Sequence, residues 1–526
     1  MTKPGSRVVH ENAEHTTLEH LGYQQELQRS FGLVGMIGFA FSIVTSWSAL
    51  GGVLVAGVNA GGPPVCFLSW SSRRPAWPSD GGTAADRKAK MCSEYPVAGG
   101  QYSWVYILAP RSIRRQLSYL TGWFMIIGLL AMGATNSFSC ANFILGQANL
   151  VMPGYVIERW HTVLVAWTVT FSSALINYWG AKLLDKLSKA FLVFNIVSFV
   201  VTVTTILACN KHKQSPSFVF QDFQNFTGFS APMAGIIGIL QPAFGMCCYD
   251  APAHMTEEIK DASKQAPLAM VLSVYIGAIT GFVFLIAVCF CIGDINELAS
   301  TSTLVPLIQI YFDSTQSNIG ACFLASLLVV INIGAGNALL AEGARSLYAF
   351  ARDRGLPFSA LFSKIESKHH TPVAAVALGA LVQMALCSIY FGTVTGFNTI
   401  IAIATEGFYL SYAMPLLVRL LSYFTGSHKQ LTGPWAMRPL VSVGVNAIGL
   451  TYLLFASITF NFPSVAPVTH ENMNYTSAAV GGIMLIALVT WFTTARMQFS
   501  GPEDGIDDLP DLTAGTASKR GRDGKR

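Results

Sequence analysis

An acidic residue, Asp250, closes an apolar stretch of the chain that begins near Ala231. It lies in the segment GMCCYDAPAHMTEE, residues 245–258, where Pro252 also removes a backbone donor. An ionisable group within an apolar span usually belongs to an ion or proton path. The alternative is that Asp250 only caps the next helix or lies at its interface with water. We predict that the helix breaks here at a site that handles charge.

Three further acids could act together with Asp250. Glu257 and Glu258 could pair with Lys260 or with the basic segment 345–354 and so close one end of a pathway, or they could form a solvated helix start. Glu406 interrupts a charge-free run, where an acid contacts a substrate or coupling ion, or hydrogen-bonds a neighbouring helix.

A metal site is not expected from this segment. His254 and Glu257 have an i, i+3 spacing that resembles a metal-binding pair, but two ligands are too few to hold an ion. We therefore expect neither a metal nor a cofactor.

The composition indicates an integral membrane protein. Of the 526 residues, 52% are hydrophobic and 12% are charged, whereas a soluble chain carries about 25% charge. The net charge of +5 is small, and no basic patch alternates with aromatic residues as in nucleic-acid binders. The cysteines lie mostly in apolar segments, which argues against a disulfide framework.

Eleven apolar windows are long enough to be transmembrane helices. They are residues 31–60, 117–150, 162–178, 190–208, 231–249, 268–292, 319–340, 372–390, 400–420, 440–460 and 477–492. An all-α fold follows, because lipid offers no partner to an open backbone group. We expect a cytosolic N-terminal tail over 1–30, a membrane domain over 31–496 and a cytosolic C-terminal tail over 497–526.

The charge distribution requires one more crossing before residue 111. With the N-terminus inside, the basic segments 111–115, 182–189 and 345–368 fall in the cytosol only if a further helix follows the first span. The segment 65–90 occupies that place, but it carries too many charges to span a bilayer. It is either a polar loop with an altered topology or a frame or splice error that replaced the second helix, and the topology favours the error.

The first span has the composition of a helix that opens at membrane depth. Four polar or aromatic residues, Thr45, Ser46, Trp47 and Ser48, precede a pair of glycines at 51 and 52. Two interrupted helices in corresponding halves of a chain indicate a transporter site at the bilayer midplane. The open backbone groups suit a substrate carboxylate and an amine or cation.

Several motifs resemble those of the fungal amino acid/choline permeases of the amino acid–polyamine–organocation superfamily, which include γ-aminobutyrate permeases and choline transporters. These motifs are EYPVAGGQYSWVYILAP (94–110), LSYLTGW (117–123), YDAPAHMTEEIKDASKQAP (249–267), AFARDRGLPFS (349–359) and PVTHENMNY (467–475). The resemblance implies about twelve spans, the first ten in two inverted five-helix repeats, with the first and sixth helices broken.

The resemblance also assigns roles to residues at the two breaks. The first opening falls on Thr45–Ser48 and the sixth on 244–250, which adds Phe244, Cys247, Cys248 and Tyr249 to the substrate site. Phe244 lies where an aromatic gate is expected, and Tyr249 could stack on an amine. Packing is the alternative role of both rings.

The predicted function is secondary active transport of a small zwitterion or amine, such as γ-aminobutyrate or choline, across the plasma or vacuolar membrane. The resemblance implies a proton as the coupling ion. Alternatives are transport of an amine-type secondary metabolite and a nutrient sensor that does not transport; a membrane enzyme lacks the paired catalytic groups it would need. The motifs at Asn225 and Asn474 match glycosylation acceptors in expected outer loops.

Overall fold

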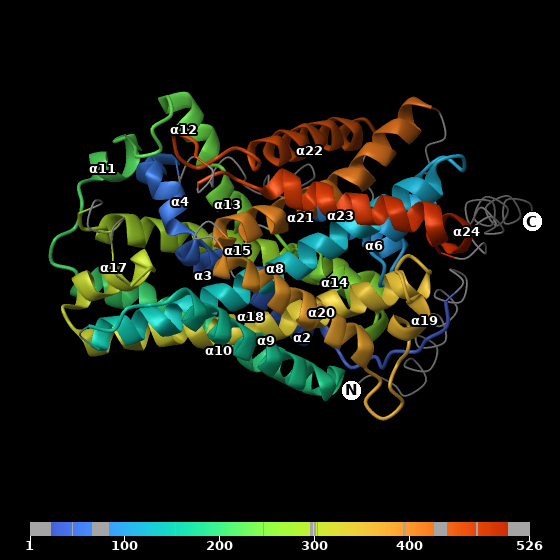
Figure 1. The fold of residues 1–526 in the computed structure, drawn as a ribbon, viewed down its shortest axis with the longest axis horizontal. Coiled ribbons are helices and arrows are strands. Elements are labelled where there is room, and N and C mark those ends of the chain that lie inside the picture. Colours follow the sequence, from blue (N-terminus) through green and yellow to red (C-terminus); the bar gives the residue numbers. More distant parts are fainter. Residues whose placement is uncertain are drawn as a thin grey trace, which may run out of the picture.

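The computed structural model describes residues 23–502 except 45, 66–83, 153, 246, 295–297, 299–300, 302, 393–395, 426–438 and 470–471. These residues form a bundle of long helices with one two-stranded sheet (Figure 1). The prediction of an all-α protein with many spans is confirmed: nine stretches of the described chain are long and apolar enough to cross a membrane.

Most spans are single helices, because only a closed backbone hydrogen-bond ladder is stable in lipid. Eight of them lie in the nine stretches above: α8 (Arg114–Val151), α10 (Ala181–Cys209), α15 (Ala262–Cys291), α18 (Asn318–Arg352), α20 (Val373–Cys387), α21 (Gly396–Phe424), α22 (Pro439–Thr459) and α23 (Thr476–Thr490). Helix α9 (Arg159–Tyr178), which covers the predicted span 162–178, is not among the nine.

Two predicted spans are made of shorter pieces: the first, and the window 231–249, which the resemblance numbers as the sixth and which we call the sixth span; only the first is among the nine stretches above. The first contains α2 (Leu33–Val44), α3 (Ser46–Gly52) and α4 (Leu54–Asn59). The sixth contains α12 (Ala231–Ile237), α13 (Leu240–Phe244) and α14 (Ala251–His254).

The remaining elements are short. The helices are α6 (Ala84–Glu94), α7 (Gln101–Leu108), α11 (Pro216–Phe220), α17 (Pro306–Thr315), α19 (Ser359–Phe362) and α24 (Arg496–Gln498), with the 3₁₀ turns η1 (Thr256–Glu258) and η2 (Ser388–Phe391) and the π-helical turn η3 (Trp491–Ala495). The strands β1 (Ala60–Gly61) and β2 (Gln224–Asn225) pair antiparallel, with Ala60 opposite Asn225. This sheet joins the end of the first span to the loop before the sixth.

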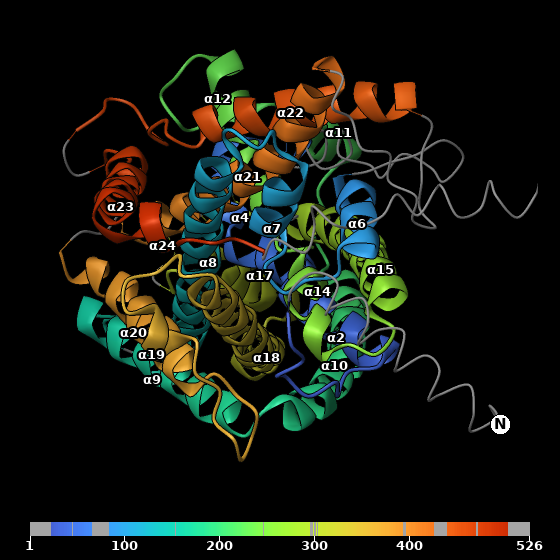
Figure 2. The same cartoon turned by 90° about the vertical axis from the view of Figure 1, so that its right-hand side faces the viewer.

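The helices α8, α18 and α21 form the centre of the bundle (Figure 2). Helices α8 and α21 cross closely at Gly128 and Gly407, where a side-chain carbon on Gly407 would come within 2.7 Å of the Gly128 backbone nitrogen. Small residues at such crossings let helices pack in a membrane without a hydrophobic driving force. The central helices therefore form a tightly packed frame beside the broken spans.

The outer helices expose large apolar side chains. Examples on α9, α10, α20, α22 and α23 are Phe171, Val193, Leu381, Ile448 and Leu485, each more than 50% exposed. In water such a surface would be costly, whereas lipid covers it without penalty. Such faces are suited to contact with lipid.

The charged segment 65–90 lies partly outside the described residues, which exclude 66–83. Its last residues, 84–90, begin α6. This helix packs along α15, and Lys88 and Lys90 are buried there. The expectation that the segment stands in place of a second span stays a prediction.

Candidate functional site

The sixth span is open where its sequence predicts a break. Helix α13 ends at Phe244 and α14 begins at Ala251, and Cys248 between them has a φ of 62°, which is strained for a residue other than glycine. The side chain of Asp250 makes no capping hydrogen bond to α14, so the capping alternative is wrong. Asp250 instead points into a buried polar cluster.

The first span changes helix around its predicted opening, although Thr45 itself lies outside the described residues. Helix α2 ends at Val44 and α3 begins at Ser46. Ser46 and Ser48 are buried. Trp47 is also buried. Its indole donates to Asn195 Oδ1 at 2.7 Å and its ring packs against Phe199 and Phe284, so the side chain faces α10 and α15.

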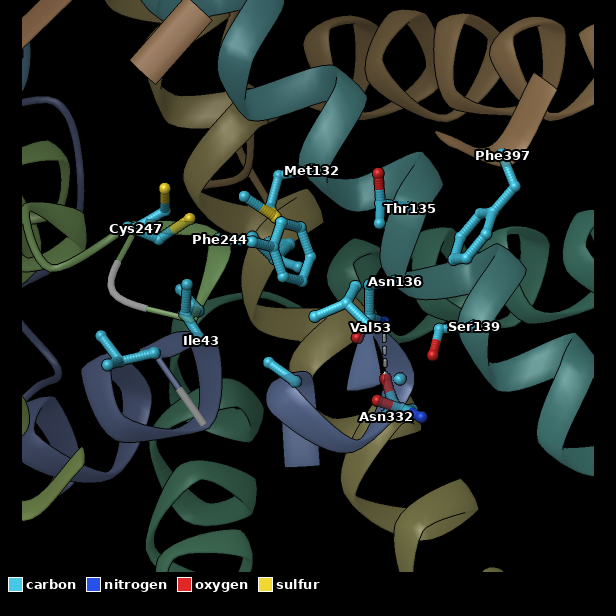
Figure 3. A pocket seen from close by; sticks show the side chains of 15 residues that line it. Ile43, Val53, Met132, Thr135, Asn136, Ser139, Phe244, Cys247, Asn332 and Phe397 are labelled. Atoms are coloured by element: carbon cyan, nitrogen blue, oxygen red, sulfur yellow. Dashed lines mark hydrogen bonds between the residues drawn. The ribbon is translucent and has the colours of Figure 1, made fainter. Parts of the chain in front are cut away.

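A cavity of about 40 Å³ lies between the two broken spans (Figure 3). The first span contributes Ile43, Val44, Ala49, Gly52 and Val53; the sixth contributes Phe244, Cys247 and Cys248; α8, α18 and α21 contribute Met132, Thr135, Asn136, Ser139, Asn332, Leu339 and Phe397. Asn136 donates to the Asn332 carbonyl at 2.8 Å and so fixes α8 against α18 at the cavity wall. The lining is mostly apolar, with a few hydroxyl, amide and thiol groups, and it carries no ionised side chain among the described residues.

A larger cavity of about 320 Å³ continues from this one toward α4, α12 and the loop around Asn472. Both cavities are lined by Phe244 and Phe397, and by Ser139. In Figure 3 the Phe244 ring lies beside Met132, inside the small cavity. Phe244 thus occupies the junction, which is the place expected of an aromatic gate.

The two glycosylation motifs differ in access, and this predicts which one is used. Asn225 is exposed, whereas Asn474 is half-buried, lines the larger cavity and donates its amide to the carbonyls of Phe460 and Phe462 at 2.6 and 3.1 Å. We expect Asn225→Gln to remove an endoglycosidase-sensitive mobility shift and Asn474→Gln to leave it. A shift lost only in the Asn474 variant would contradict this prediction.

Asp250 is fully buried and surrounded by donors from distant elements. Gln101 at the start of α7 and Tyr412 in α21 both donate to its carboxylate. His254 lies one helical turn away, with Nε2 3.2 Å from Asp250 Oδ2. Burial of a charge is tolerated only with such partners, so these contacts fit an ionised carboxylate.

A lysine ammonium occupies the position that an amine would take over Tyr249. Lys88 Nζ lies 4.7 Å from the centre of the Tyr249 ring and also over the Tyr412 ring. Tyr249 is 7% exposed and lines neither cavity. In this structure the cation stacked on Tyr249 belongs to the protein.

Two buried ion pairs lie at the end of the bundle away from the larger cavity, and we call them the cytosolic closure because the charge distribution predicts that this end faces the cytosol. Glu258 Oε1 accepts from Arg345 Nε at 2.7 Å, and Glu257 accepts twice from Arg352, at 2.8 and 3.1 Å. Of the two partners predicted for these acids, the structure has the basic segment and not Lys260.

Both described ends of the chain pack on this closure. Phe31 N donates to Glu258 O, and Phe31 O accepts from Lys260 N, in a short parallel pairing. Tyr23 donates to the Asp353 carboxylate, and the backbone nitrogen of Ser500 donates to the Asp353 carbonyl at 3.4 Å. Ordered packing therefore extends past the expected tail boundaries, to Tyr23 on one side and Ser500 on the other.

The burial of Asp353 makes this end sensitive to pH. Burial raises its pKa from 3.8 to about 6, partly offset by Arg352 and by hydrogen bonds from Tyr102 and Tyr23. A carboxyl with a raised pKa stabilises the fold below about pH 4, and this contribution of about 3 kcal/mol is lost as the pH rises through about 6.

The burial of Asp353 can be tested by thermal unfolding followed by tryptophan fluorescence. We expect the Asp353→Asn variant to have a higher unfolding temperature than wild type at pH 7.5, and the difference in unfolding temperature to shrink toward pH 5. An equal difference at all pH values would contradict this.

Glu406 lies apart from both cavities. It is 8% exposed and accepts a hydrogen bond from Asn461 at 3.1 Å, close to the end of α22. This location matches the helix–helix alternative more closely than a substrate contact.

Sequence reasoning missed one acid of this region. Glu342 in α18 is fully buried and, with Asp250 and His254, forms a cluster whose ligand atoms lie within 4.8 Å of one another. The predicted span 319–340 ends before Glu342, whereas α18 continues to Arg352. A longer window would have placed it inside the helix.

The amino acid permease family matches residues 89–488 of this chain. The chain is 59% identical over 445 residues to a Macrophomina phaseolina protein named as an amino acid/polyamine transporter, covering 84% of this chain and 97% of that one. It is 29% identical to the choline transporter of Saccharomyces cerevisiae, covering 92% of this chain and 84% of the relative. Amino-acid permease 2 of Neurospora crassa is 28% identical, with 92% and 88% covered.

Proposed function

Because this chain belongs to the amino acid permease family and is a multi-pass membrane transporter of amino acids or amines, we propose that it is a secondary active, proton-coupled symporter of a small amino acid or amine. The observation that carries the proposal is the cavity between the two broken spans, which continues into the larger cavity, while two buried ion pairs lie at the other end of the bundle. A solute site at the bilayer centre with one open side is what alternating access requires.

The cavity lining favours a solute without net charge. Its polar groups are hydroxyls and amides, such as Thr135 and Asn136, and its walls include the rings of Phe244 and Phe397. A net charge in an uncharged, low-dielectric cavity is costly, whereas a zwitterion can place each end on backbone groups of the open segments. We place γ-aminobutyrate and similar amino acids first and choline second.

An uptake panel tests the substrate. Yeast that lacks its own permeases is given radiolabelled γ-aminobutyrate, neutral amino acids, choline and a polyamine, with and without a protonophore. We expect accumulation of one class, abolished by the protonophore. Binding without accumulation would instead support a sensor, and accumulation that survives the protonophore would reject proton coupling.

The segment 65–90 needs a separate test, because we propose that it replaces a second span. The family match begins at residue 89, at its end. Sequencing transcripts across codons 60–92 is expected to reveal a reading frame that encodes an apolar helix. If the transcripts encode the present charged segment, the topology before α7 must be drawn anew. The uptake panel should include both versions of the protein.

A further inference from the structure

A second buried acid faces Asp250 from another helix. Glu342 in α18 is 0% exposed, and neither of its carboxylate oxygens has a hydrogen-bond partner among the described residues. One of these oxygens lies within 4.8 Å of ligand atoms of both Asp250 and His254. An ionised carboxylate without donors in a dry interior costs several kcal/mol, so Glu342 fits this position only with a proton.

Both ring nitrogens of His254 have other partners, so neither donates a hydrogen bond to Glu342. Its Nδ1 lies 3.2 Å from the carbonyl of Ala98, which can only accept, so Nδ1 carries a hydrogen. Its Nε2 is engaged with Asp250. The ring cannot turn freely, because Gly100 packs against it so closely that a side-chain carbon there would come within 2.6 Å of Cε1.

The other ionisable groups near the cluster favour a proton over a metal ion. Asp250 already accepts from Gln101, Tyr412 and His254, so few of its lone pairs point at a further ion. Lys88 from α6 adds a positive charge beside Asp250, and Cys248 and Tyr249 face it from the open segment. A divalent cation would be repelled by that ammonium. A proton on Glu342 only neutralises its carboxylate and brings no net positive charge near Lys88.

The cluster lies in the same interface as the cytosolic closure. The segment from Asp250 to Glu258, which contains α14 and η1, meets α18 at three places along the helix: at Glu342, at Arg345 and at Arg352. The last two contacts are ion pairs that attract at any physiological pH. The contact at Glu342 depends on its protonation state. Two carboxylates this close in a low dielectric repel strongly, so Glu342 and Asp250 repel each other when Glu342 is ionised and not when it is protonated.

We propose that Glu342 is a proton-binding site that controls the cytosolic closure. When the O–H bond of Glu342 is intact, the segment 250–258 packs against α18. When the proton leaves to water, the carboxylate of Glu342 repels that of Asp250, and the segment separates from α18. This closure would act in any solute cycle; its use as the coupling step rests on the proposed proton symport.

Thiol labelling without any substrate tests this. Cys247 and Cys248 line the small cavity, so their access from the cytosolic side reports on the closure. Inside-out vesicles carrying the full chain are treated with a membrane-impermeant maleimide between pH 6 and 9. The reporter is Cys247 in a Cys248→Ser background, because the charge of Glu342 acts on the Cys248 thiol itself. The rate is expressed as the ratio of wild type to Glu342→Gln at each pH in this background, which cancels the pH dependence of the Cys247 thiol. A Cys247→Ser, Cys248→Ser background identifies the signal.

We expect a ratio near one at the lowest pH that rises about tenfold or more with pH, because glutamine stays neutral. Glu342→Ala should behave like Glu342→Gln, which covers the case in which one of the two variants does not fold. Glu406→Gln, a buried acid of α21 outside the cluster, is the matched comparison and should retain the wild-type pH dependence. A ratio that stays constant with pH, or a pH dependence lost in Glu406→Gln instead, would overturn the proposal. Because no solute is present, this result is independent of whether the uptake panel succeeds.

Discussion

Asp250→Asn is expected to reduce solute accumulation to background while the protein remains in the membrane. The carboxylate of Asp250 is the negative partner of His254 and lies beside Lys88, in a fully buried site. Asparagine keeps the shape, but Gln101 and Tyr412 donate to different oxygens of Asp250 and asparagine has only one acceptor oxygen, so one of the two donors loses its acceptor. Asparagine also cannot balance a positive charge. Leaving buried cations without a partner costs about 3–5 kcal/mol, which corresponds to a loss of more than a hundredfold.

Accumulation is measured as protonophore-sensitive uptake, and surface abundance by biotinylation of intact cells with a membrane-impermeant reagent. Asp250→Glu is the matched control, since it retains the charge and should recover part of the activity. Solute exchange between equal concentrations on both sides separates coupling from binding. Unchanged accumulation in Asp250→Asn would remove Asp250 from the coupling mechanism.

Arg345→Ala is expected to open the cytosolic closure. Arg345 is fully buried, and its removal leaves Glu258 without its ion-pair partner in a site that is 1% exposed. Breaking a buried pair in this way costs the closed state about 3–5 kcal/mol, or a hundredfold or more in its equilibrium with the open state. Thiol labelling of Cys247 and Cys248 from the cytosolic side should therefore accelerate by a similar factor.

The double variant Glu258→Gln, Arg345→Gln separates charge from packing. It removes both charges together and leaves two amides that can bond to each other, so labelling should return toward the wild-type rate. Lys260→Gln changes a neighbouring charge that makes no ion pair with Glu258 in the structure and should have little effect. Wild-type labelling in Arg345→Ala would mean that this ion pair does not hold the closure.

The sequence predicted the parts of the site that depend on local composition. An acid and a proline in an apolar run identified the break at residues 245–250, and nine of the eleven apolar windows coincide with stretches long and apolar enough to cross a membrane; the windows 162–178 and 231–249 do not. For Glu257 and Glu258 the sequence leaves three alternatives open: an ion pair with Lys260, ion pairs with the basic segment 345–354, or a solvated helix start. In the structure both acids are buried and pair with the basic segment.

The contacts that depend on helix packing could not be predicted in this way. Gln101 and Tyr412 are 149 and 162 residues from Asp250 in the chain, and only the crossing of their helices brings them together. The direction of the Trp47 side chain could not be predicted either, because the rotation of a helix about its axis is set by its neighbours. In the structure Trp47 contacts Asn195 of α10 and Phe284 of α15. Local sequence carries no record of either arrangement.

The larger cavity and the cytosolic closure predict that inhibitors reach the site in this conformation from one side of the membrane only. A bulky amine or amino-acid analogue can enter the 320 Å³ space and rest against Phe244, but it meets the sealed ion pairs of Glu257 and Glu258 from the other direction. Analogues too large to be carried should therefore block from the outer face and have little effect when injected into the cell. Such compounds would also trap the protein in this conformation for structure determination.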